Sequence, residues 1–221
     1  MKKKYDAVII GSGVIGCCIA FELTKRGYKT LNVDKLADAG MGSTSGSCAV
    51  IRFHYSTTEG VALAREGYFY WLDWPKYLEI RDRDGMAFYR NTGALVFKTP
   101  INKNLSRVKA ALDEFGVGYL DLQPEEIERY LPNVNLASYF PQKWLDDPQF
   151  GEPTAEKIPG AVWIPESGYI SDPKLSTHNV MVAAKAKGAD FIYNTEVMDI
   201  IKKRGRAAGT ASAMISREGN E

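Results

Sequence analysis

The first 34 residues alternate between short apolar runs and one helical stretch. Residues 5–10 end in an apolar, β-branched run that is typical of a buried parallel strand. A helix-compatible run follows from Val14 to about Arg26, and Gly27 stands where a helix stop is expected. A second apolar run at 29–34 predicts another strand. The pattern therefore predicts a strand–helix–strand unit whose two strands are parallel.

The rest of the chain gives a weaker pattern with one clear return of order. Apolar residues at helical spacing in residues 58–82 predict a helix that Pro75 breaks after Trp74. Residues 133–160 have no clear period and predict a long loop. The other predicted elements are a strand at 93–99, a helix at 103–116 ending at Gly116, a short helix at 123–132, a helix capped by Asp172 and begun by Pro173 that ends before Gly188, and a strand at 190–194.

Composition and charge exclude several functional classes. Hydrophobic residues make up 45% and charged residues 25%, which is ordinary for a soluble globular protein. The net charge of +1 gives no global field for nucleic acid or an anionic membrane. No apolar run reaches the roughly 18 residues of a membrane span, and glycines interrupt the only signal-like segment. Three cysteines do not suggest a disulfide framework, so we expect a cytoplasmic protein.

A glycine-rich turn lies between the first strand and the first helix. Gly11 permits the tight turn, Gly13 lets the backbone approach a pyrophosphate, and Gly16 lets helix and strand pack closely. The helix N-terminus at Val14 and Ile15 offers free N–H groups and a partial positive charge to phosphates. The turn with its flanking elements predicts dinucleotide binding. A signal-like segment or a glycine turn without a ligand are the alternatives.

Two further features bear on the nucleotide. Asp34 closes the second strand 18 residues after Gly16, where it can accept hydrogen bonds from a ribose diol and would repel the 2′-phosphate of NADP. The segment 40–56, GMGSTSGSCAVIRFHYS, is rich in glycine and hydroxyl groups that can cap a helix or bind phosphate. A flexible surface loop is the alternative for this segment. The turn alone does not distinguish NAD from FAD.

The order of these motifs resembles the D-amino-acid oxidase/sarcosine oxidase family of FAD-dependent oxidoreductases. The resemblance rests on the glycine turn, Asp34, GSTSGSCAVIR and the later PESGYISDPKLSTHNVMVAAKAKGADFIYNTEV, and it extends to about Ile201. It implies FAD as the cofactor and an amine or amino acid as the substrate. By position it implies FAD contacts from the adenosine pair Asp34 and Lys35, from the flavin-side residues Gly42, Ser43, Thr44 and Ser45, and from the backbone of Val197.

Arg52 matches an arginine that grips the substrate carboxylate in sarcosine oxidase-like members. A guanidinium can clamp a carboxylate through two parallel hydrogen bonds. A structural ion pair is the alternative reading. Sarcosine oxidase-like sequences carry His where this chain has Ser45 and Arg where it has Ala49, so the resemblance does not imply strict sarcosine oxidase activity.

The histidines and cysteines add no catalytic group to this reading. His178 on the 173–187 helix is expected to be solvated or satisfied, and His54 receives no catalytic role. Cys17 and Cys18 are expected to be packing residues. We predict no metal site.

The predicted fold is α/β, with a Rossmann-type FAD-binding βαβ unit and an inserted α+β substrate domain. We expect residues 1–57 and 170–205 in the FAD-binding domain, 58–169 in the insertion, and a polar tail at 206–221. Only three strands of the sheet can be assigned, so we expect a chain that is incomplete at the C-terminus, with an exposed apolar edge.

The predicted function is oxidation of the C–N bond of an amino acid or N-methyl amino acid by hydride transfer to flavin. The alternatives are a non-catalytic or split flavin-binding subunit that needs a second chain, and an NAD-dependent dehydrogenase.

Overall fold

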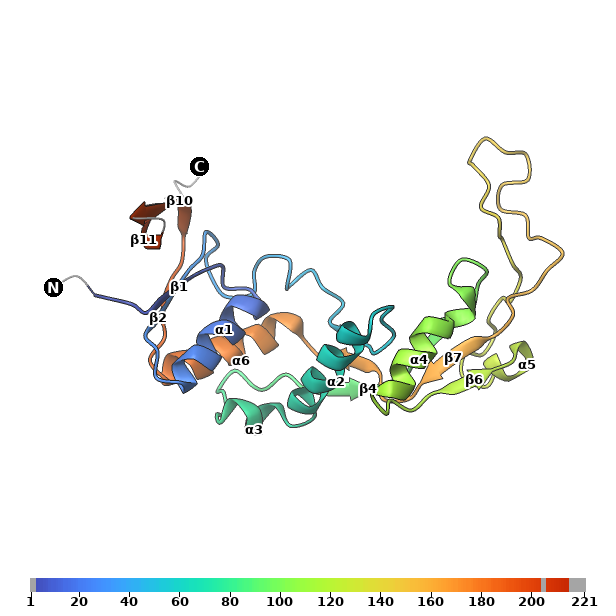
Figure 1. Cartoon of the computed structure of the whole chain (residues 1–221), viewed down its shortest axis with the longest axis horizontal. Coiled ribbons are helices and arrows are strands. Elements are labelled where there is room, and N and C mark those ends of the chain that lie inside the picture. Colours follow the sequence, from blue (N-terminus) through green and yellow to red (C-terminus); the bar gives the residue numbers. More distant parts are fainter. Residues whose placement is uncertain (1–2, 204–205, 215–221) are drawn as a thin grey trace. The chain divides into compact units, whose positions relative to one another are not determined.

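The computed structural model describes residues 3–203 and 206–214 (Figure 1). Contacts divide the chain into two compact units. The first comprises Met1–Ala49, Tyr70–Tyr89 and Ile170–Glu221, and the second comprises Val50–Phe69 and Arg90–Tyr169. The second unit differs from the expected insertion at 58–169 in two ways: residues 70–89 pack within the first unit, and residues 50–57, expected in the FAD-binding domain, belong to the second.

The first unit is built on a parallel sheet of three strands in the order β1-β2-β9. These strands are β1 (Ala7–Ile10), β2 (Thr30–Val33) and β9 (Asp190–Ile192), at the positions that the apolar runs predict. Ala7 lies beside Thr30, and Leu31 lies beside Asp190. In the described part of the sheet, β1 is an edge strand.

Two helices pack on each other within this unit, α1 (Val14–Lys25) and α6 (Pro173–Ala186) (Figure 1). Their contact is made by small and apolar side chains, and α1 also contacts β1 and β2. The fully buried side chains of the two helices include Cys17, Ala20 and Phe21 on α1 and Val180, Ala183 and Ala184 on α6. This packing gives the glycine turn at the start of α1 a rigid support.

The helix predicted over 58–82 is broken near Pro75, but the break lies at Asp73, before Trp74 rather than after it. Helix α2 (Thr58–Leu72) ends two residues before α3 (Trp74–Leu78) begins, and Pro75 lies in the first turn of α3. Asp73 caps α3 by accepting a hydrogen bond from the backbone N–H of Lys76. Tyr77 of α3 donates a hydrogen bond to Glu22 of α1 at 2.9 Å. This contact is one reason why residues 70–89 pack with the first unit.

The predicted polar tail at 206–221 is wrong over its first part. The strand β11 (Arg206–Met214) pairs antiparallel with β10 (Thr195–Lys203), with Val197 beside Ser212 and Ile201 beside Gly209. Small Ala, Ser and Thr residues dominate 207–213, so no apolar alternation identified the strand. Its backbone hydrogen bonds to β10 provide the order that the side-chain pattern does not indicate.

The second unit contains an antiparallel sheet in the order β5-β7-β6. Its strands are β5 (Ala94–Phe97), β6 (Leu120–Leu122) and β7 (Ala161–Ile164). A smaller sheet has the order β3-β8-β4, with β3 (Val50–Ile51), β8 (Gly168–Ile170) and β4 (Tyr89–Asn91). Leu122, Ile127 and Ala161 are buried at the centre of one apolar cluster of the larger sheet.

The helices of the second unit are shorter than predicted. The expected helix at 103–116 is split into the 3-10 turn η1 (Lys103–Leu105) and α4 (Ser106–Glu114), because Asn104 and Leu105 have positive φ angles of 52° and 60°. The expected helix at 123–132 is confined to α5 (Pro124–Ile127). Residues 133–160 form a long loop, as predicted. In the described part of the chain, no helix combines the length and apolar character needed to cross a membrane.

Candidate functional site

The glycine turn between β1 and α1 is closely packed against its own backbone. Gly11 has φ of +103°, a conformation that favours glycine, and its N–H donates to the carbonyl of Val33 at 2.8 Å. A Cβ added to Gly16 would lie 2.2 Å from the carbonyl oxygen of Gly11. The roles predicted for Gly11 and Gly16 therefore agree with the local geometry.

Asn32 supports this turn from inside the sheet, and the sequence analysis missed it. The side chain is buried, and its Nδ2 donates to the carbonyls of Gly16 at 3.1 Å and Gly11 at 3.3 Å. A polar residue inside the apolar strand TLNV was the available signal. Asn32 thus ties the central strand of the sheet to the turn that predicts nucleotide binding.

The N-terminus of α1 has the partial positive charge of a helix end. Gly13 at the N-cap makes no side-chain capping hydrogen bond, and a hydroxyl from the neighbouring segment accepts from the first helical N–H instead. The N–H of Val14 donates to Oγ1 of Thr44 at 3.2 Å. Ile15, in the first turn, is 74% exposed. This helix end therefore lies where the sequence predicts a phosphate group.

Asp34 lies at the carboxyl end of β2 and holds two backbone N–H groups. Its Oδ2 accepts from Ser12 at 2.6 Å and its Oδ1 accepts from Leu36 at 2.8 Å. In this arrangement the carboxylate fixes the glycine turn relative to the sheet. A carboxylate has about four lone-pair sites, so the ribose contact that the sequence predicts remains compatible with these bonds.

The start of β10 lies beside Asp34. The N–H of Thr195 donates to the carbonyl of Asp34 at 2.9 Å, and Nζ of Lys35 lies 4.0 Å from Oε1 of Glu196. Val197 follows in the same strand and is half-buried. The structure therefore brings together the chain segments of the three residues expected at the adenosine: Asp34, Lys35 and Val197.

The glycine- and hydroxyl-rich segment is anchored beside the turn. The N–H of Gly40 donates to the carbonyl of Ser12 at 2.9 Å, and the N–H of Ser45 donates to the carbonyl of Gly40 at 3.0 Å. Oγ of Ser45 also donates to the carbonyl of Gly42 at 3.0 Å. Gly42 and Ser43 are exposed. Hydrogen bonds thus hold residues 40–45 in place beside the start of α1.

The cysteines of α1 are packing residues rather than nucleophiles. Burial, with smaller contributions from Cys18 and nearby carboxylates, raises the pKa of the Cys17 thiol to about 12. Burial also raises the pKa of Cys18 to about 11. Both thiols stay protonated near neutral pH, and the thiolate is the reactive form.

Arg52 belongs to the second unit and is exposed. Its guanidinium lies over the ring of Tyr55, 4.9 Å from the centroid, and its Nη1 lies 3.5 Å from Nε2 of His54. Among the ion pairs of the described residues, none includes Arg52, so the alternative of a structural ion pair receives no support. Burial, and then the charge of Arg52, lower the pKa of His54.

Residues 6–219 match the family described as FAD dependent oxidoreductase. The chain belongs to this family. The predicted family resemblance and the FAD-dependent character of the domain are thereby confirmed.

Two curated proteins are similar in sequence to this chain. The chain is 27% identical over 136 residues to human peroxisomal sarcosine oxidase, covering 61% of this chain and 33% of that protein. It is 28% identical to glycine oxidase of Bacillus licheniformis, covering 96% of this chain and 53% of that protein. The chain thus spans between a third and about half the length of these relatives.

Two solved structures confirm the fold. L-proline dehydrogenase from P. horikoshii has a TM-score of 0.73 at 23% identity, over 96% of this chain and 50% of that chain. Glycine oxidase from Bacillus cereus ATCC 14579 has a TM-score of 0.65 at 24% identity, over 95% and 53%. The predicted α/β fold of a flavoprotein N-terminal portion is therefore correct.

Proposed function

We propose that this chain holds FAD at the start of α1, in a protein that oxidises the C–N bond of an amino acid or N-methyl amino acid. The family match supports the cofactor, and the similarity to a sarcosine oxidase and a glycine oxidase supports the substrate class. The single observation that carries the cofactor site is a tight glycine turn, with no room for a side chain at Gly16, that leads into the N-terminus of a 12-residue helix whose N-cap Gly13 provides no side-chain cap.

Each part of the site has a proposed role toward FAD. The turn and helix start bind the pyrophosphate, Asp34 with Lys35 meets the adenosine ribose, the backbone of Val197 meets the adenine, and the hydroxyl-rich segment lies along the flavin side. The pyrophosphate residues are Gly11, Gly13, Val14, Ile15 and Gly16, and the flavin-side residues are Gly42, Ser43, Thr44 and Ser45.

Arg52 is the residue proposed for the substrate. Its guanidinium would clamp the substrate carboxylate through two parallel hydrogen bonds and so fix the orientation of the α-carbon. When bound, FAD supplies the acceptor for a hydride from that carbon. A substrate amine that is already neutral needs no general base, and water hydrolyses the resulting imine. The protein residues therefore contribute position and charge rather than proton transfer.

The test is the visible absorption spectrum of the purified chain, before and after adding FAD and, anaerobically, a panel of N-methyl amino acids. We expect flavin bands that bleach with one class of substrate. The substitution Gly13→Val should weaken FAD binding by tenfold or more, because its side chain would enter the space in which a Cβ already lies 3.1 Å from Oγ1 of Thr44. The control Gly67→Ala, with no atom within 4 Å of the added Cβ, should bind FAD as the parent does. A colourless protein that NAD stabilises would contradict the proposal.

A second candidate is a flavin-binding subunit that needs another polypeptide for activity. The observation that favours it is the exposure of Val8 and Ile10 on the edge strand β1, an apolar surface that a further segment could cover. Copurification of a second chain, together with FAD binding but no bleaching by the chain alone, would favour this candidate.

A further inference from the structure

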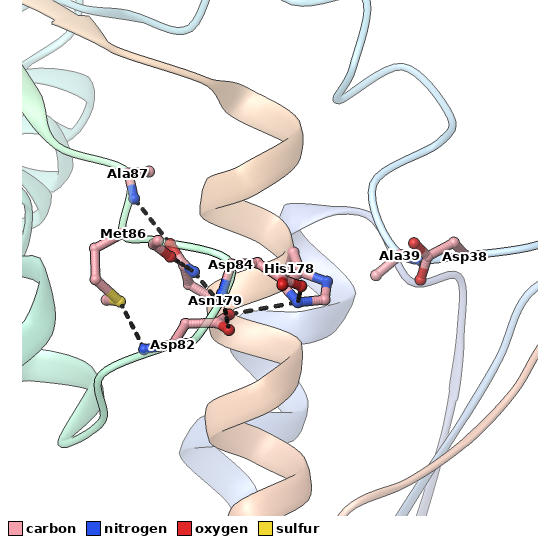
Figure 2. A network of polar contacts seen from close by, with 9 residues as sticks. Asp38, Ala39, Asp82, Asp84, Met86, Ala87, His178 and Asn179 are labelled. Atoms are coloured by element: carbon pink, nitrogen blue, oxygen red, sulfur yellow. Dashed lines mark hydrogen bonds and ion pairs between the residues drawn. The ribbon is translucent and has the colours of Figure 1, made fainter.

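Three side chains of types that can bind a metal come together within the first unit. Figure 2 shows Asp82 and Asp84 on the loop after α3, facing His178 on α6. Nε2 of His178 lies 3.4 Å from Oδ2 of Asp82 and 3.3 Å from Oδ2 of Asp84. The three ligand atoms all lie within 4.8 Å of one another.

Among the described residues, no Lys or Arg forms an ion pair with this cluster. The side chain of Asp82 is only 6% exposed, whereas that of Asp84 is 72% exposed. In the described part of the chain, the ion pairs of both carboxylates are with His178 and none is with Lys or Arg. The Asp82 carboxylate accepts hydrogen bonds from the N–H of Asp84 at 3.1 Å and from Nδ2 of Asn179 at 2.9 Å. These bonds hold two carboxylates and one imidazole together, and these are groups that bind divalent metals.

The separations fit a metal better than direct hydrogen bonds. An N–H···O bond is usually about 2.7–3.2 Å long, and the single hydrogen on Nε2 cannot point well at two carboxylates at once. Bonds of about 2.0–2.1 Å in a tetrahedral zinc site place neighbouring ligand atoms about 3.3 Å apart. Both distances from Nε2 are close to this length, and all three ligand atoms lie within 4.8 Å of one another.

A buried asparagine holds the loop in place for this arrangement. Nδ2 of Asn179 donates to Oδ2 of Asp82 and to the carbonyl of Gly85, each at 2.9 Å, and its Oδ1 accepts from the N–H of Ala87 at 3.0 Å (Figure 2). Outer-shell hydrogen bonds of this kind orient metal ligands. The loop is therefore fixed on α6 by a residue that would not itself bind the metal.

We propose that Asp82, Asp84 and His178 bind one divalent transition metal of the zinc class, with water completing the coordination. Mixed carboxylate and imidazole ligands suit zinc, whereas calcium requires six to eight oxygen ligands. The metal would fasten the 82–87 loop to α6. This inference does not rest on the proposed flavin chemistry, and it departs from the sequence-based prediction of no metal site and of a His178 that is solvated or satisfied by protein partners.

The test is calorimetric titration of the 221-residue chain with Zn²⁺, with thermal unfolding recorded in parallel. We expect one Zn²⁺ per chain and a rise in Tm on the order of 5 °C at saturating metal. The substitutions His178→Ala and Asp84→Asn should each weaken binding at least tenfold. Asp84→Asn keeps the test valid if His178→Ala fails to fold, because Asp84 is exposed.

The matched control is His54→Ala, which removes the other histidine of the chain and should leave Zn²⁺ affinity unchanged. Affinity should fall as the solution is acidified, because only a deprotonated imidazole binds the metal. The proposal is overturned by no Zn²⁺ binding, by equal binding in His178→Ala, by loss of binding in His54→Ala, or by equally tight Ca²⁺ binding. If the chain binds no Zn²⁺ and the His178→Ala variant is less stable than the parent, the cluster is a structural ion pair instead.

Discussion

Gly16 is the residue at which the site tolerates change least. A Cβ there would lie 2.2 Å from the carbonyl oxygen of Gly11, a backbone atom that cannot move aside without breaking the turn. We expect Gly16→Ala to lower the free energy of unfolding by about 3 kcal/mol. Urea denaturation followed by circular dichroism measures this.

Gly67→Ala is the matched control, since Gly67 lies in helix α2 with no atom within 4 Å of an added Cβ. It should be neutral or stabilise by about 0.5–1 kcal/mol, because alanine loses less backbone entropy in a helix. If Gly16→Ala is as stable as the parent, the turn can relax around a Cβ, and close packing does not require glycine at this position.

His54 gives the protein a specific dependence on pH. Burial and the charge of Arg52 lower its pKa in the folded state. In the unfolded chain the pKa of a histidine is about 6.5. As pH falls below that value, the unfolded chain binds the proton first, so the contribution of His54 to stability is constant above that pH and is lost below it. The parent should therefore lose more stability between pH 7 and pH 5 than His54→Gln does. Parallel pH profiles for the two proteins would contradict the lowered pKa.

Some residues of the site can be predicted from the sequence, and others cannot. Gly11, Gly13 and Gly16 are predictable because their spacing follows from one local turn. Asn32 is not, because its hydrogen bonds to the turn exist only once β2 pairs beside β1. The same holds for the partners of Asp34: the sequence predicts its place at the end of a strand, but not its hydrogen bond to Ser12.

At the scale of elements, the stability of α6 depends on the hydrogen bond that caps its first turn. Oδ1 of Asp172 accepts a hydrogen bond from the N–H of Leu175 at 2.9 Å, and Pro173 begins the helix. We expect Asp172→Ala to lower the free energy of unfolding by about 1 kcal/mol, because the capped N–H loses its partner. The exposed loop substitution Asp146→Ala should change stability by less than about 0.5 kcal/mol. If chemical denaturation gives the two variants the same stability, the cap does not contribute.

Elements were predictable where local chemistry decides them. The cap and proline of α6 and the break before α3 follow from residue types alone. The split at Asn104 and Leu105 was not predictable, because both residues adopt positive φ angles that their types do not require. Strand β11 was missed because pairing with β10, rather than an apolar alternation, makes it a strand.

At the scale of the molecule, the sheet of the first unit has an uncovered apolar surface. Side chains alternate along β1, so Ile9 is buried while Val8 and Ile10 project from the other face, 42% and 57% exposed. Parallel strands are normally buried on both faces. This face of β1 is therefore available to a partner surface.

The uncovered surface predicts concentration-dependent self-association of the 221-residue chain. An exposed apolar face on an edge strand offers both hydrophobic area and unpaired backbone groups to a second copy. Ile10→Lys should shift the chain toward the monomer in sedimentation velocity, because a charge on this face opposes its burial. Ile101→Lys, at a residue 64% exposed in the second unit, should leave the association unchanged. If both substitutions reduce self-association equally, the reduction is a general effect of added charge. If neither reduces it, another surface mediates the association.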